Sequence, residues 1–172
     1  VSDLKAKAKP EPLGKVHNAP PRLVNTTRII YQFAAGAEDA DITALREGYR
    51  DVFTRGADYA DETDLLVNAP ASTEYRVWPR VGGQGGYVRI GSPPKLPVTV
   101  DIAADHDRLG SMLQAMALRS AALGPANISA ADVAALDATL PYDCGWWSLE
   151  AGNLIADMER VAAGAGVWFG FD

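Results

Sequence analysis

Cysteine and histidine are scarce in this sequence, and their scarcity excludes several kinds of site. The chain has one cysteine, Cys144, and two histidines, His17 and His106. A single thiol excludes an intrachain disulfide framework and any zinc site built on paired cysteines, and it favours a reducing compartment. The two histidines are so far apart in the chain that a joint site would need the N-terminal segment to fold over the rest of the protein.

Long apolar runs are also missing. Residues 1–9 place Lys5, Lys7 and Lys9 between small residues with no apolar stretch behind them, a pattern that is not typical of a secretory signal. The uncharged residues 161–171 are far too few for a membrane-spanning helix, which needs about 20 residues. We therefore expect no export by a signal peptide and no membrane partner, and a location in the cytoplasm or in a virion.

The remaining composition is that of an ordinary globular chain, with 48% hydrophobic and 22% charged residues among 172. The charge is unevenly distributed. Residues 1–24 hold five of the 16 basic residues and two of the 22 acidic ones, so this segment carries +3 and the rest of the chain −9. An acidic body disfavours nucleic acid as a partner, and only the basic segment is expected to be able to bind it.

Residues 1–24 are predicted to be an extended N-terminal arm, and residues 25–172 a single α+β domain. The arm contains four prolines and no helical or alternating pattern, which favours irregular or polyproline-like chain. Such a segment cannot fold alone, so we expect it to dock on an acidic surface of a neighbouring copy. The alternative is an arm that folds back over a sheet edge of its own domain. The predicted interface residues of the arm are Lys5, Lys7, Lys9, Lys15 and Arg22.

Four segments of the body are rich in β-branched and aromatic residues and are predicted to be strands: residues 25–33, 73–78, 87–90 and 98–102. The glycine-rich residues 81–86 predict a hairpin between the second and third of them. Residues 167–171 are expected to form a final strand or a hydrophobic hook.

Apolar residues at helical spacing predict four helices. The first follows Gly36 and ends at Gly56, with Ile42 and Leu45 in its apolar stripe. The second covers residues 103–123, the third begins at Ser129, and the fourth is capped by Ser148 and closed by residues 164–166. Together these elements predict an α+β fold, a mainly antiparallel sheet with about four helices packed on one face.

The titratable clusters give little support for catalysis. The acidic residues of loop 58–64 could offer oxygen ligands to Ca²⁺ or Mg²⁺, but their spacing is not that of an EF-hand. Asp105, His106 and Asp107 are adjacent, so on a helix they diverge, which favours an N-terminal capping cluster. Asp143 is expected to raise the pKa of Cys144, which favours a structural thiol. The sequence therefore predicts no catalytic residue, no metal site and no cofactor.

Aromatic residues near the C-terminus are the other candidate interface. Consecutive side chains diverge in any regular element, so one of Trp146 and Trp147 can join the core while the other faces a different surface. Trp168, Phe169 and Phe171 form a second aromatic group that a neighbour could receive. The alternative is that all five rings fill one small core.

The leading hypothesis is a non-enzymatic structural or connector subunit of a large protein assembly. Its most concrete form is a virion component, such as a capsid-associated, neck or tail-junction protein of a tailed phage, held to copies of itself and to neighbouring proteins by the arm and the aromatic C-terminus. Two alternatives remain open: an accessory subunit of a multi-protein enzyme complex, or a small metal-binding enzyme that uses the acidic loop.

Overall fold

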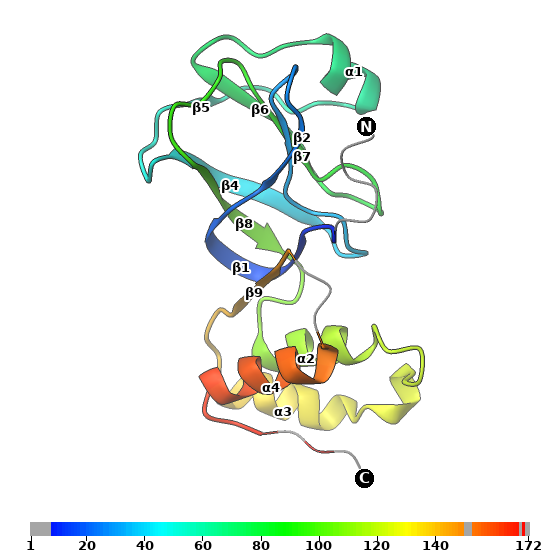
Figure 1. Ribbon diagram of the computed structural model, residues 1–172. Coiled ribbons are helices and arrows are strands. Elements are labelled where there is room, and N and C mark those ends of the chain that lie inside the picture. Colours follow the sequence, from blue (N-terminus) through cyan, green and yellow to red (C-terminus); the bar gives the residue numbers. More distant parts are fainter. Residues whose placement is uncertain (1–7, 150–152, 169, 171–172) are drawn as a thin grey trace.

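The computed structural model describes residues 8–149, 153–168 and 170. The described chain has mixed α+β content, with two mostly antiparallel sheets in one part of an elongated molecule and helices α2–α4 in the other (Figure 1). The strands are β1 Glu11–Ala19, β2 Arg22–Asn25, β3 Ile30–Gln32, β4 Ala40–Glu47, β5 Thr54–Arg55, β6 Glu74–Trp78, β7 Tyr87–Ile90, β8 Val98–Ala104 and β9 Gly145–Ser148. The helices are α1 Glu62–Val67, α2 Leu109–Ala117, α3 Ala130–Thr139 and α4 Leu154–Gly164, with a 3₁₀ turn at Pro125–Asn127.

The strands form two sheets that pack face to face. The first sheet has the order β4-β8-β1-β9 and the second the order β2-β3-β7-β6-β5, and all neighbours are antiparallel except β5 and β6. Fully buried side chains from both sheets meet between them, among them Ile42 and Val100 from the first and Val77 and Val88 from the second. The predicted α+β class is confirmed, but the single sheet covered by helices is replaced by a sandwich with a separate helical layer.

Residues 11–19 are not the irregular arm that the prolines suggested. They form β1, an internal strand between β8 and β9 of the protein's own first sheet. Pro12 is tolerated there because β8 pairs with β1 only from Lys15 onward, so the missing N–H of Pro12 lies beyond the end of that ladder. The register is irregular between Val16 and Ala19, which hides the alternation typical of a strand. Residues 1–7, with Lys5 and Lys7, lie outside the described residues.

The helix expected between Gly36 and Gly56 is also wrong, because this segment forms β4 and β5. A β-bulge shifts the register of β4 against β8 between Ile42 and Ala44. The extra residue places buried Ile42 and Leu45 three positions apart on the same face. Spacing of three is the signal of a helix, so the bulge explains the error.

Other elements agree more closely with the sequence. The hairpin of β6 and β7 and strand β8 are confirmed, and Ser129 caps α3 by accepting a hydrogen bond from the Asp132 N–H at 3.2 Å. Asn153, rather than Ser148, caps α4, because Ser148 lies in β9. The expected strand 25–33 is shorter, since a turn separates β2 from β3. The described tail residues 167, 168 and 170 have no regular structure.

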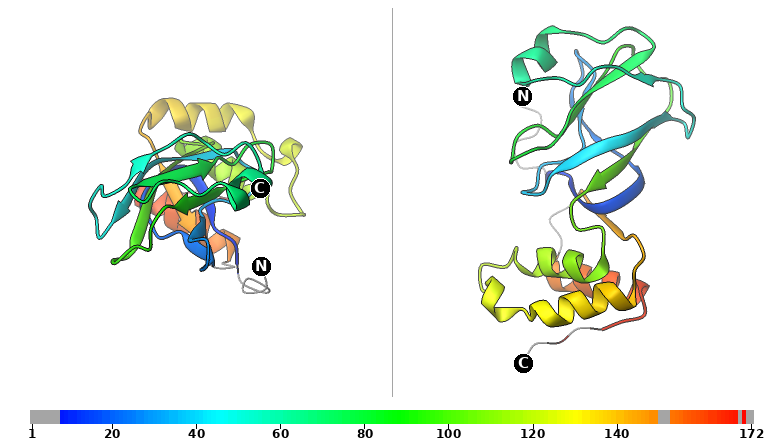
Figure 2. Two further views of the ribbon diagram at one scale, coloured as in Figure 1. Left: turned by 90° about the horizontal axis from the view of Figure 1, so that it is seen from above. Right: turned by 180° about the vertical axis from the view of Figure 1, so that it is seen from behind.

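Helices α2–α4 enclose a second core that reaches the sandwich through β1 (Figure 2). Met112 and Met116 of α2 and Met158 of α4 are buried in it, together with Leu13 of β1. Val16, three residues further along β1, is instead buried between the two sheets. Strand β1 therefore contributes side chains to both cores.

Because Leu13 is fully buried in the helical core, we expect Leu13→Ala to lower the free energy of unfolding by about 2–5 kcal/mol. Leu23→Ala is the matched control, since Leu23 is 41% exposed on β2 and should cost about 0.5 kcal/mol or less. Urea denaturation followed by circular dichroism measures both values. Equal losses for the two variants would contradict the internal position of β1.

Candidate functional site

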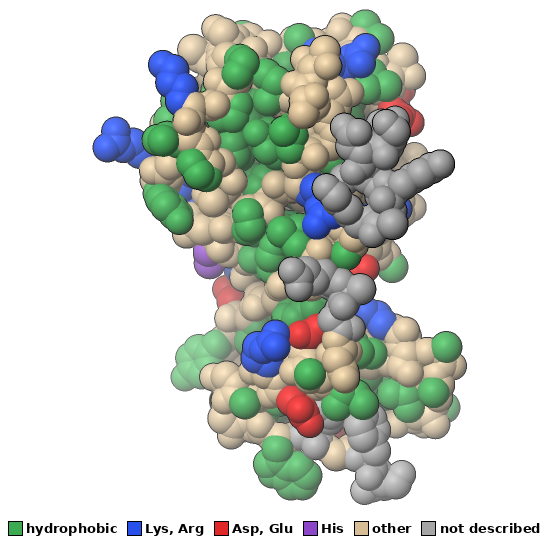
Figure 3. All heavy atoms as spheres, in the orientation of Figure 1, with side chains coloured by type: hydrophobic (Ala, Val, Ile, Leu, Met, Phe, Trp, Pro, Cys, Tyr) green, Lys and Arg blue, Asp and Glu red, His purple; other side chains and the backbone are tan. Residues whose placement is uncertain are grey.

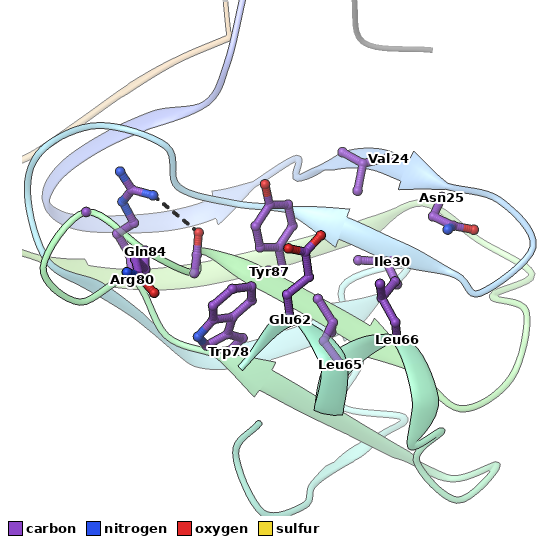
Figure 4. A pocket seen from close by; sticks show the side chains of 12 residues that line it. Val24, Asn25, Ile30, Glu62, Leu65, Leu66, Trp78, Arg80, Gln84 and Tyr87 are labelled. Atoms are coloured by element: carbon purple, nitrogen blue, oxygen red, sulfur yellow. Dashed lines mark hydrogen bonds between the residues drawn. The ribbon is translucent and has the colours of Figure 1, made fainter. Parts of the chain in front are cut away.

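A pocket of about 400 Å³ lies on the outer side of the second sheet, between α1, β2, β3 and the loop that joins β6 to β7. Its volume is at the small end of the range for ligand pockets, about 300–1,000 Å³. Figure 4 shows aliphatic side chains from β2, β3 and α1 around one part of the space and two aromatic rings around the other. The principal lining side chains are Val24, Asn25, Ile30, Glu62, Leu65, Leu66, Trp78, Arg80, Gln84 and Tyr87.

The aromatic wall consists of Trp78 and Tyr87, which face each other across the β6–β7 hairpin. Their rings stack with centroids 5.9 Å apart and planes 28° from parallel. The Gln32 side-chain amide donates a hydrogen bond to the Tyr87 hydroxyl at 3.2 Å. Burial, followed by the charge of Glu62, raises the pKa of Tyr87. The pair is therefore fixed in place and neutral at physiological pH.

The two charged residues of the pocket play different roles. Arg80 donates hydrogen bonds to backbone carbonyls, among them that of Gly36 at 3.0 Å, so its guanidinium fastens two loops. Glu62 is the first residue of α1 and is exposed, and within the described part of the chain its carboxylate has no hydrogen bond or ion pair. Figure 4 shows this carboxylate directed toward the space beside Tyr87. The pocket thus combines an apolar wall with a free acceptor, which suits an apolar ring that carries a hydrogen-bond donor.

An apolar turn surface, defined here as Tyr49, Val52 and Leu96, lies at another edge of the sandwich. Glu47 and Arg50 exchange backbone hydrogen bonds of 2.9 and 3.1 Å, which makes Gly48 and Tyr49 the central residues of a tight turn. Tyr49 has φ +64° and is 76% exposed, although this position of such a turn favours glycine. In Figure 3 hydrophobic side chains lie at the left edge of the upper part, where the β4–β5 connection protrudes in Figure 1.

The connection between β7 and β8 completes this surface. The Gly48 N–H donates to the Pro97 carbonyl at 2.9 Å, and the side chain of Leu96 packs against Gly48. Val52 and Leu96 are each more than half exposed. The buried Glu47 carboxylate holds the second loop in place by accepting hydrogen bonds from the Lys95 and Leu96 N–H groups. Three large apolar side chains are therefore held out toward solvent by an ordered framework.

The described basic residues of the predicted arm have different surroundings. Lys9 is exposed. Lys15 forms an ion pair of 2.6 Å with Asp143, and Arg22 donates to the Leu149 carbonyl at 3.2 Å. Lys15 and Arg22 thus contact their own chain, and a role of these residues toward a neighbour stays a prediction.

The C-terminal aromatic residues do not fill one core. Trp146 and Trp147 diverge along β9, as strand geometry requires, so that Trp146 packs against the helical core and Trp147 against the sandwich core. The Arg119 guanidinium lies 5.4 Å from the centre of a Trp146 ring. Trp168 instead follows α4 and is largely exposed. Phe169 and Phe171 lie outside the described residues, and the interface role of this group stays a prediction.

The acidic loop is engaged in local structure. Arg55 pairs with Asp58 at 2.9 Å, and Asp61 caps α1 by accepting from the Asp64 N–H at 2.8 Å. Hydrogen bonds from Asn68 and from the Ala60 N–H lower the pKa of Asp64. Across residues 8–149, 153–168 and 170, no group of three or more His, Cys, Asp or Glu side chains could hold a metal ion.

Two smaller expectations have different outcomes. Residues 105–107 do not cap α2, because its N-cap is Arg108, which makes no capping hydrogen bond; the Asp105 carboxylate instead accepts from the Asp39 N–H at 3.1 Å. Burial raises the pKa of Cys144, and the nearby carboxylates of Asp137 and Asp143 raise it further. The expected direction for this thiol is therefore confirmed.

The sequence analysis missed the pocket and the turn surface. Trp78 and Tyr87 could have been paired from the predicted hairpin, because they flank its loop symmetrically. Helix α1, however, was expected to be part of a loop, so nothing placed Glu62 above the hairpin. Tyr49 lies within the segment that was expected to be a helix, between Gly36 and Gly56, and this expectation hid its exposure.

Comparisons with protein-family models, curated proteins and solved structures returned no match to this chain. None of the helices in the described ranges has both the length and the apolarity needed to cross a bilayer. Functional arguments therefore rest on the geometry of the chain alone.

A polar cluster surrounds Asp101 on the face of β8 opposite the sandwich core. Its carboxylate accepts from Arg46 at 2.7 Å and from the Asn18 N–H at 2.9 Å, and it lies 3.4 Å from Nδ1 of His17. Burial raises the pKa of Asp101, but these hydrogen bonds outweigh burial and lower the pKa to about 2. The cluster joins three neighbouring strands of the first sheet, which indicates a structural role.

This lowered pKa should make stability depend on pH. At pH values above the ordinary pKa of 3.8, the Asp101 carboxylate contributes about 2 kcal/mol to the free energy of unfolding, at about 1.4 kcal/mol per pKa unit. This contribution is lost as the pH falls from about 4 to about 2. We call this loss of stability at low pH the acid limb. Asp101→Asn should lower the free energy of unfolding at pH 7 and make the acid limb less steep. Asp51→Asn, at the exposed partner of the same Arg46, is the control and should keep the limb. Urea denaturation at a series of pH values measures it, and an unchanged limb in Asp101→Asn would contradict the assignment.

Proposed function

We propose that this chain is a non-enzymatic structural or connector subunit of a larger protein assembly. The single observation that carries the proposal is the exposed aromatic ring of Tyr49, held at the tip of a strained turn beside Val52 and Leu96. A virion component, such as a capsid-associated, neck or tail-junction protein, is the most concrete form of the proposal.

The backbone of Tyr49 makes this exposure informative. A residue with a side chain pays about 1–2 kcal/mol in the left-handed region, and glycine avoids this cost. The ring of Tyr49 recovers little of it by burial, because the side chain is mostly exposed. Strained residues of this kind gather at functional positions. A ring that stabilises a contact with another protein would account for both the strain and the exposure.

The neighbouring residues support a contact surface of this type. Large aromatic side chains surrounded by smaller apolar ones are typical of the centres of protein interfaces. The framework beneath the turn surface is ordered by the Glu47 carboxylate and by the hydrogen bond between Gly48 and Pro97. A preorganised surface loses little conformational entropy when a partner binds. An accessory subunit of an enzyme complex could use the same surface, with a catalytic protein as its partner.

Tyr49→Gly separates the contribution to folding from the contribution to assembly. Because glycine accepts the positive φ of this position, we expect the melting temperature to stay equal or rise. Because the aromatic ring is removed, self-association should weaken by about fivefold or more, which is the effect of losing an interface side chain worth more than about 1 kcal/mol. Calorimetry and sedimentation velocity over a concentration series measure the two quantities.

Tyr142→Gly is the control, since Tyr142 is 71% exposed in another part of the chain and should leave self-association unchanged. A Tyr49→Gly protein that assembles like the wild type would contradict the proposal. A wild-type protein that stays monomeric at its highest soluble concentration would contradict assembly from copies of this chain.

A further inference from the structure

The pocket beneath α1 and the exposed ring of Trp168 have complementary chemistry. The pocket offers the stacked rings of Trp78 and Tyr87, an aliphatic wall and the carboxylate of Glu62, which has no hydrogen bond or ion pair to the described residues. An indole has a large apolar face and one N–H donor, and it buries best where both can be satisfied. Trp168 is 88% exposed, the largest exposed fraction among the large hydrophobic residues of the described chain.

Trp168 cannot reach the pocket of its own molecule. Trp168 lies four residues after Gly164, the end of α4, and four residues reach at most about 14 Å. A compact chain of this length is about 40 Å across. Figures 1 and 2 show α1 at one end of the elongated molecule and the helical layer with α4 at the other. The ring can therefore reach only the pocket of a second molecule.

We propose that the indole of Trp168 in one copy inserts into the α1 pocket of the next copy. Its face lies against the Trp78 and Tyr87 pair, and its N–H donates to the Glu62 carboxylate. The proposal rests on the proposed function, and it deepens it by naming the partner as a second copy and the contact as head-to-tail. A contact between two different surfaces leaves a free indole at one end of the assembly and a free pocket at the other. Further copies therefore add until the oligomer closes on itself or a filament grows.

A single indole ring buries little surface area, and this small area determines how strong the contact between two copies can be. A tryptophan buries about 150–250 Å², whereas stable interfaces bury about 1,200–2,000 Å² in total. The contact is therefore an anchor within a weak, concentration-dependent association of free copies. Closure of a ring or attachment to a common partner strengthens it by raising the effective concentration.

Two variants that each lose one half of the contact test the proposal. Trp168→Ala keeps the pocket but has no ring to insert. Glu62→Trp keeps Trp168 but places an indole of its own in the pocket. Because Glu62 is exposed, we expect this variant to stay folded, and its melting temperature checks this. Each variant alone should self-associate at least about 30-fold more weakly than the wild type, the effect of truncating a central interface residue.

When both variants also carry Tyr49→Gly, which removes the other proposed contact, their mixture should form a one-to-one dimer and nothing larger, because it contains one usable indole and one usable pocket. Sedimentation velocity at the highest soluble concentration distinguishes this dimer from monomers and from wild-type oligomers. Glu62→Gln, which keeps an acceptor oxygen, should retain most of the association. Wild-type oligomers in either variant alone, or a mixture that stays monomeric, would overturn the proposal.

The outcomes also separate this inference from the proposed function. Loss of association in Tyr49→Gly but not in Trp168→Ala would keep the assembly role and overturn the head-to-tail contact. Loss in Glu62→Trp but not in Trp168→Ala would assign the pocket to a different side chain and would likewise overturn it.

Discussion

Strand β1 is the element on which the rest of the structure depends, because it is paired on both sides and reaches both cores. It pairs with β8 on one side and with β9 on the other. Gly14 makes this double pairing possible, since its φ is +63° and an added Cβ would lie 2.2 Å from the Cys144 carbonyl oxygen. Arg119 reinforces the junction by pairing with Glu11 at 2.7 Å and with Glu38 at 3.2 Å. The sandwich and the helical layer are joined through this strand.

The junction determines where the candidate binding features lie. The sandwich carries the α1 pocket and the turn surface, while the helical layer carries Trp168. Because the two parts meet end to end, helix α1, which lines the pocket, and helix α4, which Trp168 follows by four residues, lie at opposite ends of the molecule (Figure 1). A molecule with complementary features at its two ends is suited to repeating contacts in one direction. The strained ring of Tyr49 lies on a third surface and can serve a different neighbour.

The sequence was sufficient wherever local chemistry decides the structure. Residues 73–90 predicted the hairpin of β6 and β7, since glycines at its tip accept the positive φ values that a tight connection needs. Ser129 predicted the start of α3 because an N-cap acts within three residues. Composition and element order were enough for the α+β class. Trp168 was named together with Phe169 and Phe171 as a candidate interface group, because large aromatic side chains are enriched at interfaces, and that role stays a prediction.

Only the tertiary structure decided the elements whose stability comes from distant partners. Residues 11–19 form a strand because their partners in β8 and β9, more than 80 residues away, supply the hydrogen bonds, whereas Pro12 and Gly14 by themselves favour irregular chain. The bulge in β4 gave the buried residues of a strand the sequence spacing that is typical of a helix. Pairing with β8 determined that the segment forms a strand and not a helix. The pocket exists because α1 packs over a hairpin that begins seven residues later in the chain. Local residue preferences are worth fractions of a kcal/mol per residue, and burial and pairing across the sheets outweigh them.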